Sequence, residues 1–158
     1  DCATESSGYS CMGCNGGVIQ SALDYVRDHG ITTEDRYSYQ GNQGSCNVGD
    51  IYLRTSGYTG IGYKDENALK DAVGSVGPVS VAVNADPLQS YGGGVLNVQC
   101  SDSINHGVLA VGYGQQDGLN YWLVKNSWGD GWGESGYYKM AIGSNTCGIA
   151  NQACYPNL

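Results

Sequence analysis

Positively charged residues are scarce in this chain of 158 residues. Seven lysines and arginines stand against 15 aspartates and glutamates, which gives a formal net charge of −8. Proteins that bind nucleic acids or anionic membrane surfaces do so with clusters of basic residues. The composition therefore argues against a nucleic-acid partner and against a membrane partner.

Long apolar runs are also missing. No stretch approaches the roughly 18 apolar residues that a membrane-spanning helix needs, and no basic segment followed by an apolar one opens the chain. The sequence predicts a soluble protein that is already processed or cut. The acceptor motif Asn-x-Ser/Thr is absent as well, so glycosylation gives no indication of the compartment.

Cysteine and glycine are abundant by contrast. Seven cysteines are many for a reducing cytosol and favour an oxidising compartment, in a lysosomal, digestive or secreted protein. The chain also has 26 glycines and only 14% charged residues. This balance favours strands, tight turns and close backbone packing over long charged helices.

Two segments have the periodicity of amphipathic helices. Residues 18–29 place apolar side chains on one face, and Gly30 follows as a stop signal. A second helix is expected from an Asp65 cap to Val76, before Gly77 and Pro78.

The pattern changes to strands in the second half. Alternating or short apolar runs occupy residues 79–85, 108–111, 121–124 and 137–142. We predict an α+β fold with a helical part at 1–58, a β-barrel at 59–153 and a carboxyl-terminal arm at 154–158.

Three segments carry recognisable motifs. His106 lies in Ser103-Ile-Asn-His-Gly-Val-Leu-Ala-Val-Gly-Tyr-Gly114, Asn126 lies in Lys125-Asn-Ser-Trp-Gly-Asp-Gly-Trp-Gly-Glu-Ser-Gly-Tyr137, and Cys14-Asn-Gly-Gly17 stands near the amino end. Together they resemble the papain and cathepsin L family of cysteine proteases over essentially the whole chain. The resemblance implies a partial helical left domain, an antiparallel β-barrel right domain and peptide-bond hydrolysis.

The resemblance makes His106 the catalytic base and Asn126 its orienting partner. An imidazole that takes the thiol proton lowers the cysteine pKa and yields a thiolate nucleophile. An Asn oxygen can orient the ring without adding a competing charge. The family's shielding indole falls on Trp128, which would keep water from the His–Asn bond. His29, at a helix end, is most simply a charge partner for the helix dipole.

The nucleophile is expected outside these residues. In the family the His and Asn follow the catalytic cysteine by about 130 to 150 residues, and counting back from His106 passes Asp1. The Gln of the oxyanion hole has no match either. We therefore expect this chain alone to be an inactive part of a cysteine endopeptidase, which needs a missing amino-terminal segment or chain. The alternative is a nucleophile-altered, inactive relative with a structural or templating role, similar to the sponge silicateins.

The resemblance also implies a binding cleft for extended polypeptide substrates. Gly16 and Gly17 would let a substrate backbone lie close and pair in strand-like fashion. The stretch from Gly17 to Cys46 is too short for the occluding loop of the cathepsin B branch, which favours endopeptidase action. The pocket for the residue two before the cut would be lined by Val18, Ile19, Ala82, Ile104 and Gly107, with Gln152 at its floor.

The family pattern pairs Cys2 with Cys46 and Cys100 with Cys147, and it joins Cys14 to the missing segment. For an additional Cys11–Cys154 bridge, the sequence favours neither its presence nor its absence. Cys11-Met-Gly-Cys14 has the spacing of a redox or zinc pair, but no βαβ pattern or second such pair accompanies it. We expect no metal and no cofactor. Protein inhibitors that block the cleft are further partners implied by the resemblance.

Overall fold

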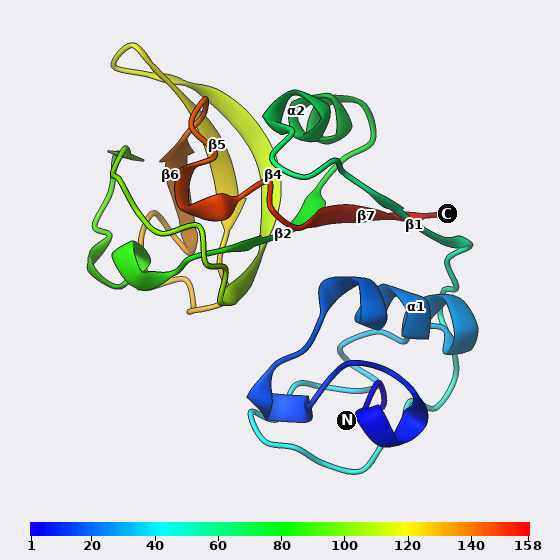
Figure 1. Cartoon of the computed structure of the whole chain (residues 1–158). Coiled ribbons are helices and arrows are strands. Elements are labelled where there is room, and N and C mark those ends of the chain that lie inside the picture. The colour runs from blue at the N-terminus through cyan, green and yellow to red at the C-terminus, as the bar shows by residue number, and fades with distance from the viewer. The chain divides into compact units, whose positions relative to one another are not determined.

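The computed structural model describes all residues, 1–158, and the chain divides into two compact units. The first unit comprises residues 1–59 and 156–158, and the second comprises residues 60–155. Figure 1 shows the helices and strands, which are α1 (Ile19–His29), β1 (Gly57–Gly60), α2 (Glu66–Ser75), β2 (Val79–Val83), β3 (Val95–Leu96), β4 (His106–Gln116), β5 (Leu119–Lys125), β6 (Tyr137–Ala141) and β7 (Ala153–Asn157).

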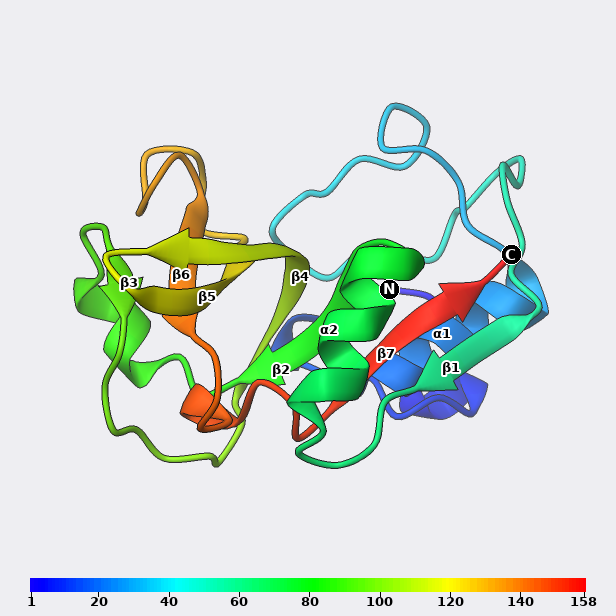
Figure 2. The same ribbon diagram turned by 90° about the horizontal axis from the view of Figure 1, so that it is seen from above.

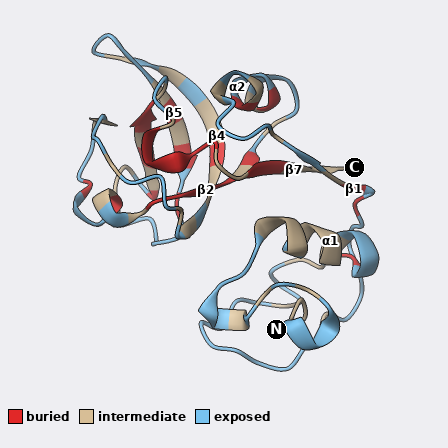
Figure 3. Ribbon diagram, in the orientation of Figure 1, coloured by how far each residue is buried: buried red, intermediate tan, exposed pale blue.

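The first predicted helix is confirmed as α1. It ends at Gly30, whose φ of 87° is a conformation that side chains with a Cβ rarely adopt, and whose N–H donates to Val26 O at 2.9 Å. None of its residues is buried. Figure 3 shows α1 in the colours of intermediate and exposed residues, whereas the strands of the sheet contain buried ones. The first unit therefore has little hydrophobic core of its own.

The second predicted helix is confirmed as α2. The Asp65 carboxylate accepts a hydrogen bond from Ala68 N at 2.9 Å, which satisfies one of the free N–H groups of the first turn. Leu69 and Ala72 are its buried residues. The helix packs on strands β2 and β4, as Figure 2 shows from above.

The sheet has the strand order β1-β7-β2-β4-β5-β6-β3. The β2–β4, β4–β5 and β5–β6 pairs are antiparallel, and only the short β3 pairs in parallel with its neighbour. Strands β4 and β5 are joined by the two-residue turn Asp117-Gly118, where both φ values are positive, at 51° and 81°. This geometry matches the right-handed twist of the strands and favours Asp-Gly.

The hydrophobic core lies in the second unit. Figure 3 shows its buried residues on the central strands and on the inner face of α2. Its fully buried side chains include Leu69, Val79, Val81, Val83, Leu88, Trp122, Val124, Tyr138, Met140 and Ile149. The same strands carry His106 and the residue before Asn126, so the core fixes the backbone from which both side chains project.

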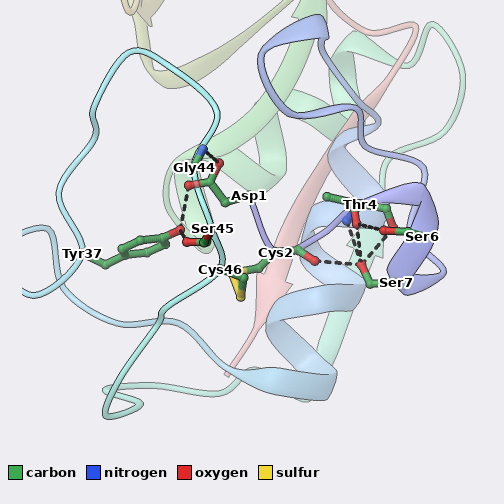
Figure 4. The surroundings of a disulfide bond; sticks show 9 residues. All are labelled: Asp1, Cys2, Thr4, Ser6, Ser7, Tyr37, Gly44, Ser45 and Cys46. Carbon is green, nitrogen blue, oxygen red and sulfur yellow. Dashed lines mark hydrogen bonds between the residues drawn. A yellow bond between two sulfur atoms is a disulfide. The ribbon is translucent and has the colours of Figure 1, made fainter.

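Each unit contains one disulfide, Cys2–Cys46 in the first and Cys100–Cys147 in the second. Around Cys2–Cys46 the carboxylate of Asp1 accepts hydrogen bonds from Tyr37 Oη and Gly44 N, both at 2.7 Å (Figure 4). No helix of the structure has the length and apolar character to cross a bilayer.

Cys11, Cys14 and Cys154 are free thiols in the structure. Cys11 and Cys154 belong to different units, and the bridge between them stays a prediction. Cys154 lies opposite Ser80 in the β2–β7 pair and is fully buried. Burial raises the pKa of its thiol to about 11. A neutral, enclosed thiol is a poor nucleophile for disulfide formation.

Candidate active site

The sheet register brings His106 and Asn126 together. His106 is the first residue of β4 and lies opposite Val83 of β2, while Asn126 directly follows β5. Because β4 and β5 are antiparallel, the start of one strand lies beside the end of the other. His106 Nε2 and Asn126 Oδ1 are 2.8 Å apart.

A backbone contact fixes the orientation of the Asn126 amide. Its Oδ1 also accepts a hydrogen bond from Ser127 N at 2.8 Å, so this atom must be the oxygen. His106 Nε2 is then the donor, and the neutral ring carries its proton there. The other ring nitrogen, Nδ1, keeps a lone pair that can accept a proton. Asn126 is only 7% exposed, which shields the bond.

Two indoles form a wall beside the imidazole. The ring centroids of His106 and Trp128 are 5.2 Å apart with an interplanar angle of 32°. Trp128 makes an edge contact with Trp132 at 5.1 Å, and Trp132 does the same with the buried Tyr138 at 5.8 Å. This aromatic row connects the imidazole to the core of the second unit.

Glycines shape the loop after Asn126. Gly133 and Gly136 have positive φ values, and a Cβ on Gly133 would come within 2.6 Å of Tyr137 O. Gly136 O accepts from Asn126 N at 2.9 Å, which fixes the backbone of the orienting residue. Local backbone geometry therefore requires glycine at positions 133 and 136 of this motif.

Residues 1–157 match the family described as papain family cysteine protease. This chain belongs to that family. It is 48% identical to digestive cysteine proteinase 1 of Homarus americanus over 100% of the chain and 51% of the relative. It is 46% identical to cathepsin L of Sarcophaga peregrina, again over 100% of the chain and 48% of the relative.

A solved structure shows the same fold. Digestive procathepsin L 3 of the Tenebrio molitor larval midgut superposes with a TM-score of 0.92 at 48% identity, over 97% of this chain and 52% of that one. The α+β papain-like fold is thereby confirmed. The chain spans about half the length of the relatives that it matches.

The predicted substrate-binding residues of this papain-family chain fall into two sets. In the second unit Ala82 lies opposite Gly107, Ala82 N donates to Gln152 O at 3.0 Å, and Ile104 lies two residues before His106. In the first unit the set is contiguous, at Gly16, Gly17, Val18 and Ile19.

The backbone N–H and C=O of Gly17 face away from the neighbouring segment at Cys11. Gly17 forms an isolated antiparallel bridge with Cys11, in which the hydrogen bonds run from Met12 N to Gly16 O and from Val18 N to Ser10 O. In such a pair the N–H and C=O of Gly17 point away from the Cys11 strand. A Cβ on Gly17 would come within 2.8 Å of Cys11 Sγ, so the close approach requires glycine.

The unit that carries His106 has no thiol ready to act as its partner. Cys100 and Cys147 are bonded to each other, and Cys154 is buried with a raised pKa. No group of three or more His, Cys, Asp or Glu side chains is placed to hold a metal ion. The residues gathered at this site are an imidazole, the amide that is hydrogen-bonded to it and the indole beside it.

Sequence reasoning missed two groups that support this arrangement. Ser127 N orients the Asn126 amide, and Trp132 links Trp128 to the core. A backbone N–H leaves no signature in a sequence. Trp132 lies within the glycine-rich motif, but its spacing alone does not show which ring it contacts.

Proposed function

We propose that this chain supplies the acid–base and substrate-binding part of a cathepsin L-type cysteine endopeptidase. The observation that carries the proposal is the His106 Nε2 to Asn126 Oδ1 contact of 2.8 Å, with the amide oriented by Ser127 N. This contact leaves Nδ1 of His106 as the atom that takes the thiol proton. The cysteine nucleophile and the Gln of the oxyanion hole come from polypeptide outside these 158 residues.

The proton-transfer steps of the proposed reaction follow from the tautomer of His106, in which Nε2 carries the proton and Nδ1 is free to accept one. His106 Nδ1 accepts the proton of the cysteine thiol, and the thiolate adds to the scissile carbonyl. The tetrahedral adduct collapses as the imidazolium donates that proton to the leaving amine, which breaks the C–N bond and leaves a thioester. Water then gives a proton to Nδ1 and adds to the thioester, and the thiolate departs as the acid product forms.

Substrate binding is proposed for both sets of residues. The outward N–H and C=O of Gly17 pair with the backbone of an extended peptide. Ala82, Ile104, Gly107 and Gln152 of the second unit line the pocket for the residue two before the cut. Their small and apolar side chains favour leucine, valine or phenylalanine there, and Gln152 adds a polar group at the floor.

Location and further partners follow from the same proposal. Two disulfides and relatives named as digestive enzymes support an oxidising digestive, lysosomal or secreted location. The similarity to procathepsins supports binding of inhibitory polypeptides in the substrate cleft.

The test is reconstitution. The chain is expressed alone and as a chimera with the part of the Homarus proteinase that it does not match, and both are assayed on fluorogenic peptides and with an epoxide thiol trap. The proposal expects no hydrolysis by the chain alone and trap-sensitive hydrolysis by the chimera. His106→Ala in the chimera is the matched control and must abolish it.

Two outcomes oppose the proposal. A correctly folded chimera without activity would show that these residues do not supply the acid–base part of the enzyme, since the Homarus part provides the nucleophile. Activity that survives His106→Ala would show that another group is the base.

A further inference from the structure

Two irregular loops of the second unit carry predicted pocket residues. Residues 101–105 precede His106 and contain Ile104, and residues 142–152 connect β6 to β7 and end at Gln152. Neither loop belongs to the strand ladder that holds the base. Backbone hydrogen bonds tie Gln152 O to Ala82 N, Cys147 O to Asn84 N and Asn105 N to Val83 O. The rest of each loop is fixed by side-chain contacts and by the disulfide.

Asn151 joins these loops directly, whereas Asn84, which follows β2, contacts them through Nδ2 to Ser103 O and through its backbone N to Cys147 O. Its Nδ2 donates to Asp102 O at 2.8 Å, and its Oδ1 accepts from Asn145 Nδ2 at 2.8 Å. The amide thus uses its donor on one loop and its acceptor on the other.

The Asn145 end of this contact is anchored to the core. Asn145 Oδ1 accepts from Ala150 N at 2.8 Å, and its backbone N donates to Glu66 Oε2 at 2.9 Å. Glu66 also accepts from Gly143 N and, through Oε1, from the indole of the fully buried Trp122 at 3.1 Å. Helix α2 and strand β5 therefore hold the second loop.

The two loops are also tightly packed where Asn151 joins them. A Cβ on Gly148 would come within 2.9 Å of Asp102 O, 3.0 Å of Asn151 Nδ2 and 3.1 Å of Ile104 Cγ2. The Ile104 side chain therefore lies directly against the loop that Asn151 fixes. An exposed Lys64–Asp102 ion pair at 2.8 Å adds a weaker contact.

We propose that Asn151 is a positioning residue for substrate selectivity, because it holds the Ile104 loop against the Gln152 loop and so sets the shape of the pocket. This inference rests on the proposed function, since it takes both residues to line that pocket. The base is held separately, by the His106–Val83 register and by the Asn126 N to Gly136 O bond. Loss of Asn151 therefore changes selectivity without removing the base.

The variants separate the two contacts. Asn151→Asp keeps an acceptor for Asn145 Nδ2 and loses the donor to Asp102 O, whereas Asn151→Ala loses both. Ser144→Ala is the matched control, because Ser144 lies exposed in the same loop and outside this network. The first readout is amide hydrogen exchange of residues 101–105 in the 158-residue chain.

The second readout is kinetic and uses the active chimera. The ratio of kcat/KM for two peptides that carry leucine or alanine two residues before the cut is compared between variants. Both Asn151 variants are expected to exchange faster at 101–105 and to lower this ratio about tenfold, as expected for one lost hydrogen bond between protein groups. The change lies in KM, with kcat retained, and Ser144→Ala behaves as the parent does.

The results that overturn the inference differ from those that overturn the proposed function. Unchanged exchange at 101–105, or an equal loss for both peptides, rejects the positioning role. An inactive parent chimera rejects the proposed function and, with it, the selectivity role of Asn151, while the exchange measurement still decides whether Asn151 holds the loops.

Discussion

The hydroxyl of Tyr91 donates a 2.9 Å hydrogen bond to Glu134 Oε1, across 43 residues of sequence. The same carboxylate accepts from Gly94 N at 2.9 Å, and its other oxygen pairs with Lys139 Nζ at 2.6 Å. Glu134 thereby attaches the glycine-rich segment after Tyr91 to strand β6. The hydrogen bond from Lys139 is the main reason why the pKa of Glu134 is held below its ordinary value of 4.5.

This carboxylate predicts an acid-dependent loss of stability. A group whose pKa is lowered by folding stabilises the native state above its unfolded pKa, and this stabilisation is lost as the pH falls through the folded pKa. We expect Glu134→Gln to lower the urea midpoint at neutral pH, and the difference from the parent to shrink below about pH 4.5. The exposed Asp71→Asn is the control. A difference that is constant with pH would contradict this account.

Asn126→Ala tests the orientation of the base. Without Oδ1, His106 Nε2–H loses its acceptor and the ring can adopt the other tautomer. We expect nitrogen NMR to show a mixture of tautomers in the chain, and kcat of the active chimera to fall about a hundredfold with little change in KM. Asn120→Ala, at an exposed position of β5, is the control. An unchanged tautomer would show that Asn126 does not orient the ring.

The Cys100–Cys147 disulfide predicts a large contribution to stability. It closes a loop with a sequence separation of 47, for which chain entropy gives about 4 kcal/mol at 25 °C. Cys100→Ser with Cys147→Ser should lower the free energy of unfolding of the second unit by about that amount in urea titrations. Cys14→Ser should leave this transition unchanged. A loss below about 1 kcal/mol would mean that the unfolded chain is already constrained.

The free thiols are predicted to react very unequally. Cys14 is exposed, whereas Cys154 is buried with a pKa raised to about 11, so only about one in ten thousand Cys154 thiols is ionised at neutral pH. Iodoacetamide should modify Cys14 in the native chain and Cys154 only after denaturation. Mass spectrometry of peptides locates each adduct, and Cys14→Ser should remove the early one. Rapid native modification of Cys154 would show that β7 opens readily.

The helices could be predicted closely because their end signals are local. The Asp65 cap and the Gly30 stop act on the adjacent turn, and both helices end within two residues of the prediction. Strand β4 was harder, since it begins at His106 and ends at Gln116, beyond the predicted residues 108–111. Its apolar pattern is interrupted by Gly107, Gly112 and Gly114. These glycines nevertheless belong to the strand because they pair with residues of β2 and β5. The short β1 and β3 have too few residues for any periodicity, and Pro156 within β7 argues against a strand there.

The residues of the site that belong to a sequence motif could be predicted. The resemblance paired His106 with Asn126 and placed Trp128 beside them, and the structure has these three side chains together. It did not reveal Ser127 N as the group that orients the amide, nor Asn151 as the contact between loops. Both contacts use backbone atoms, which every residue has, so only the fold can select them.

The two units are stabilised by different interactions, because α1 of the first unit has no buried residues. The first unit is held by a covalent bond, Cys2–Cys46, and by hydrogen bonds such as those to Asp1, whereas the second is held by its core. A reductant removes the main constraint on the first unit, because few of its apolar groups leave water on folding. Heat and denaturant act chiefly on the second, whose packed interior they must expose. Reduction therefore removes most of what holds the first unit, whereas the second unit loses its Cys100–Cys147 bond and keeps its core.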